Sequence, residues 1–532
     1  MNSVTETAAT RQAQSFSSPL EAVKPGYHIP LLLAFGVIAR IAVFHADQVI
    51  FSWRSTDMAG IAMNYYRNGF HFLHPQVLWG GNGPGFVEME FPIIPFLLAV
   101  LYKLFGVHDW LALVIPMASG LGLVVVVYLF ARQVFGPAIG FVAGLCAASP
   151  PPLAALSVAL WPDPPMIFFG TLGIYSLVRW SQNNSWGYFV MGACATALAI
   201  LLKLTALYLG IPILYICLVR FGPRFWKKAW VWLLAFLILA PPGIWYFYAH
   251  TLYLGYHNTF GILSGGYLKF ADSEILRDPA FYGMSLLRMV VYHFTPVVFA
   301  LFLYGIMASQ REKMNYVFHV WFGAVLLYLV VAAKGVWIGH FQYMLPVVPP
   351  GAILAGVGTV SLLGKLDTFP PLVGWPKSSW CVVLALTFVG GTAVADRLYE
   401  SPETYTMRTW SHDRETGLAV ARVTAPGSLI MVVDNQMGGE PDRIMTPPNV
   451  FYFGDRRGWY VALSWLTEDL VEQRRSEGAR YLVITGNTIS LFEASCVPVK
   501  TYLSAHYAMV LDTPEGVIYD LAVKKEAKPM SG

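Results

Sequence analysis

Long apolar runs separated by short polar turns fill the chain from about residue 28 to residue 396. Runs such as "WVWLLAFLILAPPGIWYFY" and "VFHVWFGAVLLYLVVAA" approach the roughly 20 apolar residues that a helix needs to cross a bilayer. The pattern predicts an all-α polytopic membrane protein with about eleven transmembrane helices. We expect these helices near 28–46, 109–132, 138–160, 164–180, 187–203, 204–220, 229–249, 288–308, 316–333, 341–363 and 379–396.

The segment 187–220 leaves the helix count open. "AILLKLTALYLG" makes it nearly continuous, with Lys203 in the middle, so it forms two helices or one tilted helix. With two helices, most Lys and Arg residues of the turns fall on one side, which the positive-inside rule assigns to the cytoplasm. The N-terminus is then cytoplasmic, whereas Asp57, Asp163, the loop 250–287 and the C-terminal residues are extracytoplasmic. A single tilted helix would reverse every later orientation.

The segment 47–108 is predicted as a long first extracytoplasmic loop. It contains the amphipathic stretch "TDMAGIAMNYYRNG" and the apolar stretch "FPIIPFLLAVLYKLFG", which is too short to span. Such stretches beside a membrane are typical of helices that lie in the interface. Between them is the glycine-rich strap, "WGGNGPGFVEME" (residues 79–90).

The pattern changes after about residue 397. "GSLIMVVDN", "NVFYFGDRRGWYV", "ARYLVITG" and "GVIYDLAV" resemble β-strands, "LTEDLVEQRRSEG" is an amphipathic helix, and another helix is expected near 488–507. We therefore predict a transmembrane module at 27–397 and a soluble, extracytoplasmic α/β domain at 398–525. Residues 1–26 and 526–532 are predicted to be disordered tails, the first of them cytoplasmic.

Composition supports the membrane assignment and excludes several functions. The chain is 56% hydrophobic and 12% charged, with a mean hydropathy of +0.54 and a net charge of +4. No nucleic-acid partner is expected. The five cysteines have no disulfide or metal spacing. No nucleotide-binding, nucleophile-elbow or zinc-protease motif is present, so the chain offers no nucleotide-binding domain to drive transport.

Ionisable residues at membrane depth are costly and are therefore the candidate site residues. Asp57 in "STD" and Asp163 in "WPDPP" could each cap a helix or serve function. Lys203 either snorkels to the outer surface or binds an anion. Glu88 and Glu90 are usually explained as solvated loop acids. Further cations and histidines stand in the loop 250–287 or near predicted helix ends, and each alone suits a structural role: His250, His257, Arg288, His293, Lys334 and His340.

The first loop with its acid, the segment "EMEFPIIPFLLAVLYKLFG" and the later "DPP" resemble the GT-C glycosyltransferases over about residues 28–360. The similarity is greatest to the bacterial branch of protein O-mannosyltransferases and aminoarabinose transferases. The resemblance implies a polyprenyl-phosphate-linked sugar donor, an inverting transfer on the extracytoplasmic face, and a lipid, glycan or protein acceptor.

The resemblance also assigns residues. Asp57 matches the first-loop aspartate, the base or acceptor-binding acid, and Asp163 matches the second acid. Glu90 matches a glutamate associated with a divalent metal ion, for which His257 is a second candidate ligand. The chain departs from the family at Met58, where mannosyltransferases have Glu, and at Phe91, where aminoarabinose transferases have Lys. The donor phosphate must then be bound by other cations, first by Lys203, with Arg67, Arg288 and Lys334 as further candidates.

The predicted function is a hexosyl- or pentosyltransferase of the bacterial inner membrane, embedded among membrane lipids. Asp57 and Asp163 are the predicted catalytic residues. A flippase or transporter of lipid-linked sugars is the alternative, and it would need charged residues through the depth of several helices. A third possibility is a scaffold that binds a cell-wall polymer, in which the acids only cap helices. The sequence leaves the sugar, the acceptor, the oligomeric state and the role of the C-terminal residues open.

Overall fold

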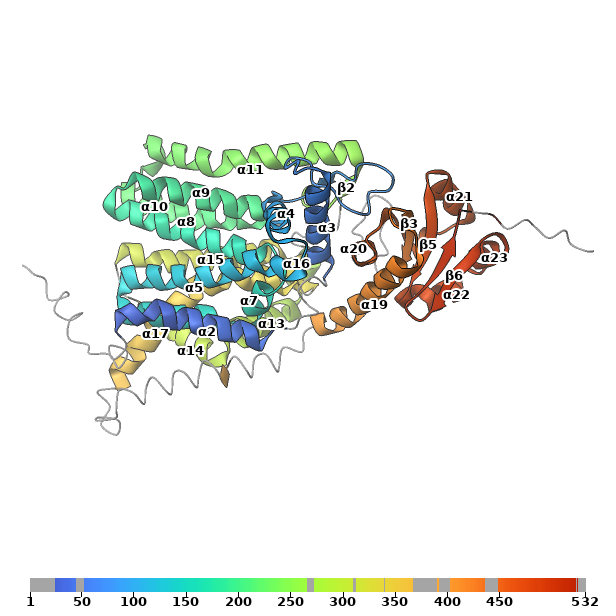
Figure 1. The fold of residues 1–532 in the computed structure, drawn as a ribbon. Helices are drawn as coiled ribbons and strands as arrows, with labels where there is room; N and C mark the ends of the chain where they lie inside the picture. Colours follow the sequence, from blue (N-terminus) through green and yellow to red (C-terminus); the bar gives the residue numbers. More distant parts are fainter. Residues whose placement is uncertain are drawn as a thin grey trace, which may run out of the picture.

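A bundle of long helices occupies most of the structure (Figure 1). The structure is a computed structural model that describes residues 24–44, 52–265, 272–309, 312–338, 340–366, 390–391, 402–435, 448–522 and 524. The bundle contains α2 (His28–Ala42), α5 (Val114–Phe135), α6 (Pro137–Ala148), α7 (Pro151–Ser157), α8 (Asp163–Asn183), α9 (Trp186–Leu202), α10 (Gly210–Phe221), α11 (Ala229–Tyr256), α12 (Ser273–Arg277), α13 (Pro279–Arg288), α14 (Pro296–Ala308), α15 (Val317–Val331), α16 (Ala333–Trp337) and α17 (Val348–Leu366).

Six helical segments among the described residues are long and apolar enough to cross a membrane, or up to eight if each of two bent pairs is one span. The prediction of about eleven spans is therefore not confirmed. The span expected at 379–396 lies outside the described residues except for 390 and 391, and the two predicted tails lie outside them except for residues 24–26.

Two predicted spans are broken at prolines. The segment 138–160 bends by 69° between α6 and α7, and the segment 288–308 bends by 100° before α14. Helix α7 and helix α14 each begin at a proline, which has no N–H to continue the preceding helix. The mean hydropathy of a long segment stays high across such a break, so the apolar pattern does not predict it.

The segment 187–220 forms two helices, so the alternative of one tilted helix is wrong. Lys203 has an extended backbone (φ −154°, ψ 122°) and ends α9. A short 3-10 helix, Leu204–Leu209, then leads into α10.

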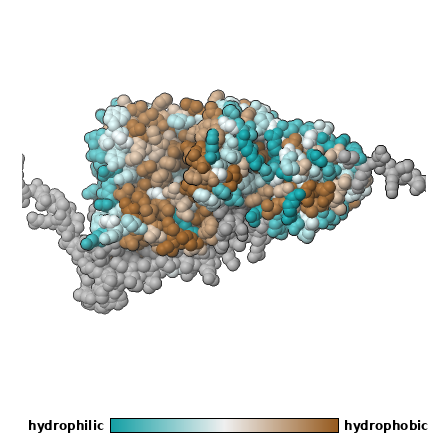
Figure 2. All heavy atoms as spheres, in the orientation of Figure 1, coloured by the Kyte–Doolittle hydropathy of each residue, from teal (hydrophilic) through white to brown (hydrophobic). Residues whose placement is uncertain are grey.

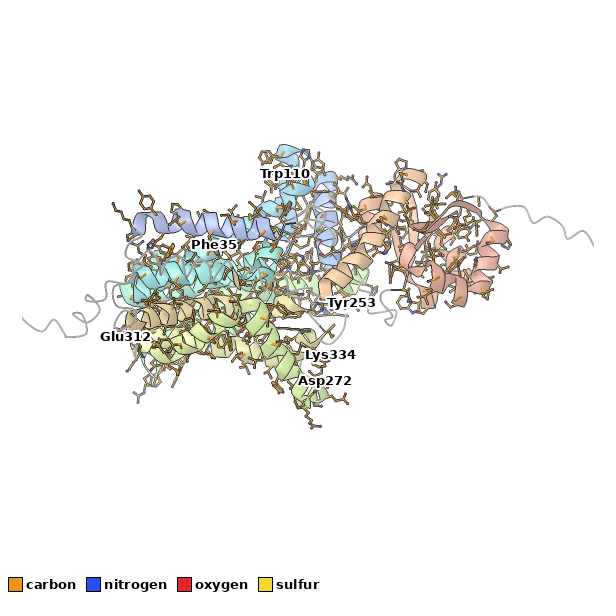
Figure 3. The ribbon with its side chains drawn as sticks, turned by 90° about the horizontal axis from the view of Figure 1, so that it is seen from below. Phe35, Trp110, Tyr253, Asp272, Glu312 and Lys334 are labelled. Carbon is orange, nitrogen blue, oxygen red and sulfur yellow. The ribbon has the colours of Figure 1, made fainter. Side chains whose placement is uncertain are left out.

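The surface is that of an integral membrane protein. Figure 2 shows apolar side chains over the middle of the bundle. Hydrophilic side chains cover the end of the bundle away from the C-terminal region, and much of the C-terminal region itself. Figure 3 places Glu312 at one end of the bundle and Tyr253 and Lys334 at the other, near the C-terminal region. We call this second end the α3 end, because α3 also lies there (Figure 1).

The first loop contains the two helices that the sequence predicts, α3 (Trp53–Asn68) and α4 (Ile93–Phe105). Helix α3 lies across the end of the bundle rather than along it (Figure 1). The strap between the two helices carries the short strand β1 (Val87–Glu88), which pairs in parallel with β2 (Asn258–Thr259) after α11.

A five-stranded sheet with helices around it forms the C-terminal α/β region, described over residues 402–435 and 448–522, which contacts the first loop. The strand order is β4-β3-β5-β7-β6; β3 is parallel to β4 and β5, whereas β7 is antiparallel to β5 and β6. The elements are α19 (Pro402–Val423), β3 (Leu429–Asp434), α20 (Asn449–Gly454), β4 (Arg457–Ala462), α21 (Glu468–Ser476), β5 (Ala479–Thr485), α22 (Ile489–Ser495), α23 (Val497–His506), β6 (Ala508–Thr513) and β7 (Gly516–Asp520).

Two sequence interpretations in this region need correction. The first half of "NVFYFGDRRGWYV" is helix α20 and only the second half is a strand. The helix expected near 488–507 is divided at Cys496 into α22 and α23, because Pro498 stands in the first turn of a new helix.

Candidate functional site

Helix α3 positions Asp57, and a capping box fixes where the helix begins. Ser52 Oγ accepts from the Ser55 backbone N–H at 3.1 Å, and Ser55 Oγ accepts from the Ser52 N–H at 2.9 Å. Asp57 stands one turn further along and is only 2% exposed. The interpretation of Asp57 as the helix cap is therefore wrong, because Ser52 performs that role.

The Asp57 carboxyl group faces two tryptophan side chains, Trp79 of the strap and Trp53 of α3. Trp79 Nε1 of the strap donates to Asp57 Oδ1 at 2.9 Å. Within the described part of the chain, the buried Oδ2 has no hydrogen-bond partner. Burial raises the pKa of Asp57 to about 8, although the Trp79 hydrogen bond, the Arg54 charge and the nearby Trp53 side chain oppose the shift. Helix α3 is not among the membrane-spanning segments.

Asp163 and Lys203 form a buried ion pair. Lys203 Nζ lies 2.8 Å from Asp163 Oδ1, and the two side chains are 11% and 1% exposed. Lys203 also lies over the Tyr343 ring at 5.4 Å. Asp163 makes no side-chain cap hydrogen bond at the start of α8, and its Oδ2 is buried without a described partner. Neither the capping role of Asp163 nor the snorkelling of Lys203 is observed.

Glu90 is buried at the end of the strap, contrary to the expectation of a solvated loop acid. The next residue, Phe91, donates its backbone N–H to Leu201 O at 3.0 Å, which places the strap beside the end of α9. Arg54 Nη2 pairs with Glu90 Oε1 at 2.9 Å. The buried Nη1 of Arg54 has no hydrogen-bond partner in the described residues.

These side chains share one charged environment. Arg54 acts electrostatically on both Asp57 and Asp163, and Glu90 also acts on Asp163. The structure thus brings together three predicted acids and one predicted cation with one cation that the sequence analysis missed. Fully ionised, they would carry one more negative than positive charge. We call this set the α3-end cluster: Arg54, Asp57, Glu90, Asp163 and Lys203.

Arg67, a predicted phosphate-binding residue, does not reach this cluster. It lies ten residues after Asp57, about 15 Å along the helix at 1.5 Å per residue. Its guanidinium binds Asp455 of the C-terminal region, with Nη1 to Oδ1 at 2.6 Å and Nη2 to Oδ2 at 3.1 Å. Both side chains are about half exposed, so Arg67 connects α3 to the C-terminal region.

Arg288 contacts α16, the short helix that carries Lys334. Arg288 Nη1 donates to the backbone carbonyl of Val336 at 2.7 Å, which joins α13 to α16. Lys334 is half-buried on α16.

Glu88 is fully buried and has a structural environment, which corrects the loop-acid expectation. Its Oε2 accepts from Thr259 Oγ1 at 2.6 Å and from the Ser264 N–H at 3.3 Å, and its Oε1 accepts from Ser264 Oγ at 3.1 Å. His250 Nδ1 lies 3.7 Å from the same Oε1. Glu88 therefore anchors the strap to the segment after α11.

The residues expected to hold a metal do not form a ligand set here. Glu90 Oε1 is bound to Arg54, and His257 is exposed in the left-handed position that ends α11. No group of three or more His, Cys, Asp or Glu residues suited to a metal occurs in the described ranges. The divalent metal stays a prediction.

Sequence reasoning missed Arg54 and Trp79. Arg54 stands three residues before Asp57, the spacing that puts two side chains on the same helix face, so this signal was available. Trp79 opens the glycine-rich strap, and nothing local to it indicates which acid it binds.

A family model and solved structures resemble this chain. The model of the dolichyl-phosphate-mannose-protein mannosyltransferase family matches residues 89–245, a range that includes Glu90, Asp163 and Lys203. No curated protein sequence matches the chain significantly.

The structural matches extend over nearly the whole chain. ArnT from Cupriavidus metallidurans in the apo state gives a TM-score of 0.62 at 16% identity, covering 96% of this chain and 98% of that one. The same protein bound to undecaprenyl phosphate gives 0.61 at 14% identity, covering 93% and 98%. The apo oligosaccharyltransferase of Archaeoglobus fulgidus gives 0.56 at 12% identity, covering 87% and 70%. These are GT-C glycosyltransferases, so the resemblance is confirmed and the chain has their fold.

Proposed function

We propose that this chain transfers a sugar from a polyprenyl-phosphate-linked donor to an acceptor hydroxyl on the extracytoplasmic face of the bacterial inner membrane, with its N-terminus in the cytoplasm. The α3-end cluster is the observation that carries the proposal. Support also comes from the similar structures, one of them bound to undecaprenyl phosphate and another tethered to an acceptor peptide.

The cluster has polar atoms without a described partner that could bind the acceptor hydroxyl and the donor phosphate. Asp57 Oδ2 is a buried acceptor with no described partner, and an acceptor hydroxyl can donate to it. Arg54 Nη1 is a buried donor with no described partner, and the Lys203 ammonium has further N–H groups besides the one facing Asp163. Arg54 and Lys203 can therefore bind the phosphate oxygens of the donor.

In the proposed mechanism, the acceptor oxygen attacks the anomeric carbon from the side opposite the phosphate. The bond from the anomeric carbon to the phosphate oxygen breaks, and its electron pair stays on polyprenyl phosphate. Asp57 accepts the hydroxyl proton, and the two cations stabilise the charge that develops on the leaving phosphate. Asp163 orients Lys203 through their ion pair. The configuration at the anomeric carbon inverts.

The rate of transfer should rise with pH up to about 8. The pKa of Asp57 is raised to about 8, so near neutral pH most of the empty protein holds the protonated acid, which cannot accept a proton. Below this value kcat/KM should increase up to about tenfold per pH unit, because the carboxylate fraction rises in that proportion. A rate that falls steadily from pH 6 to pH 8 would contradict the role of Asp57 as base.

A donor screen tests the proposal as a whole. Membranes containing the protein are incubated with polyprenyl-phosphate mannose, glucose, arabinose or aminoarabinose, and released polyprenyl phosphate and transferred sugar are both measured. We expect equal amounts of the two products from at least one donor. Movement of the intact donor across the membrane without release of polyprenyl phosphate would instead indicate a flippase.

A further inference from the structure

The strap extends one edge of the C-terminal sheet. Strand β4 is an edge strand, and its outer side faces the strap. The Gly458 N–H donates to Leu78 O at 3.0 Å, and the Gly81 N–H donates to Gly458 O at 2.7 Å. Gly80 and Trp459 are paired in antiparallel orientation. Residues 78–81 thus bind the C-terminal region through backbone groups, in the manner of an added strand.

This contact requires glycine in the strap. Gly81 has φ +71°, and a Cβ there would lie 2.6 Å from Nε1 of Trp459. A Cβ at Gly80 would lie 2.4 Å from the Cα of Gly85. The glycines of the strap are therefore explained by two close contacts, one of Gly81 with the Trp459 side chain and one of Gly80 with Gly85 inside the strap.

Trp79 lies in the middle of this contact and points away from it into the site. The residue is 6% exposed, and its Nε1 donates to Asp57 Oδ1. The C-terminal region also binds the residue before Asp57, since Thr56 Oγ1 lies 2.6 Å from Asn449 Oδ1 of α20. Asp57 is thus held from two sides by residues that the C-terminal region contacts.

We propose that Trp79 is a positioning residue and that docking of β4 on the strap holds it in place, so that the C-terminal α/β region controls the orientation of Asp57. By fixing Oδ1, the indole N–H leaves Oδ2 to face the acceptor hydroxyl. This inference rests on the proposed function of Asp57. It gives the C-terminal region a catalytic effect in addition to any role in acceptor binding.

The test compares pH profiles of sugar transfer by the full-length protein and two variants. Trp79→Phe keeps the ring and removes the N–H donor. Because a hydrogen bond to the carboxylate favours the charged form, its loss should move the rise in kcat/KM to higher pH by about one unit. At pH 7 kcat should fall about tenfold, whereas the KM for the donor should change little. A merely structural role would lower the amount of active protein without moving the profile along the pH axis.

The second variant disturbs the docking and leaves Trp79 itself intact. Gly81→Val introduces a side chain against Trp459, and we expect the same alkaline shift as for Trp79→Phe. Trp110→Phe, which changes an exposed tryptophan, is the matched control and should retain the wild-type profile. If wild-type protein transfers sugar and both test variants keep its pH profile, the positioning role is wrong and the proposed function stands. If wild-type protein transfers no sugar from any donor, the proposed function itself fails.

Discussion

Asp57→Asn is expected to lower sugar transfer by about 10²- to 10⁴-fold, the usual contribution of a positioned general base. The amide has nearly the same shape as the acid and can still accept from Trp79, but it cannot take the proton of the acceptor hydroxyl. The measurement is kcat/KM for the donor at pH 8, with the acceptor at a saturating concentration. Retention of wild-type activity would remove the assigned role of Asp57.

Stability measurements separate this loss from misfolding. A buried carboxyl whose pKa rises from 3.8 to about 8 on folding contributes stability at low pH, and this contribution is lost as the pH rises through 8. An amide does not ionise, so Asp57→Asn should be at least as stable as the wild type at pH 9. Asp109→Asn is the matched control: this exposed acid accepts from Tyr452 at 3.3 Å, is not in the cluster, and should leave transfer unchanged.

Lys203→Met is expected to lower both stability and transfer. Removing one partner of a buried ion pair leaves the other charge uncompensated, at a cost of about 3–5 kcal/mol. Asp163 is 1% exposed at its side chain and would be left in this state. Thermal unfolding of the detergent-solubilised protein should show a clear decrease in Tm.

The double variant Asp163→Asn/Lys203→Met distinguishes a structural role from phosphate binding. Because it removes both charges, most of the stability should return. Transfer should nevertheless remain low, since the phosphate of the donor still lacks the ammonium. Recovery of transfer together with stability would show that Lys203 is only a structural partner of Asp163.

Part of the site could be predicted from the sequence, because burying a charged side chain costs free energy. Lys203 and Asp163 stand in or beside apolar runs, and such groups need a partner or a function. The two residues are 40 positions apart in sequence, and their pairing joins the start of α8 to the end of α9. The sequence identified both residues but did not identify them as partners, because the extended backbone at Lys203 that turns its side chain inward arises only in the packed bundle.

The environment of the acids in the strap was the part of the site that the sequence predicted least well. Glu88 and Glu90 look like solvated acids because glycine and proline surround them, yet both are buried by contacts with distant segments. Glu90 meets Arg54 across 36 residues, and Glu88 meets Thr259 across 171. Neither distance leaves a periodic signal in the sequence.

The helix count shows a different limit. The length of an apolar run predicts which segments belong to the bundle, but prolines such as Pro151 and Pro296 break two runs into bent pairs of helices.

In the C-terminal region, aromatic and β-branched residues of "NVFYFG" suggested a strand. The segment forms a helix that begins after Pro448 and packs against α3.

The most direct test of the account measures transfer on each side of the membrane. Sealed right-side-out and inverted vesicles are given a water-soluble, short-chain form of the prenyl-phosphate sugar that is active in the donor screen. Because the α3-end cluster is assigned to the extracytoplasmic face, transfer and release of prenyl phosphate should occur in right-side-out vesicles and be lost with Asp57→Asn. Transfer confined to inverted vesicles, or uptake of the intact donor without release, would contradict the account.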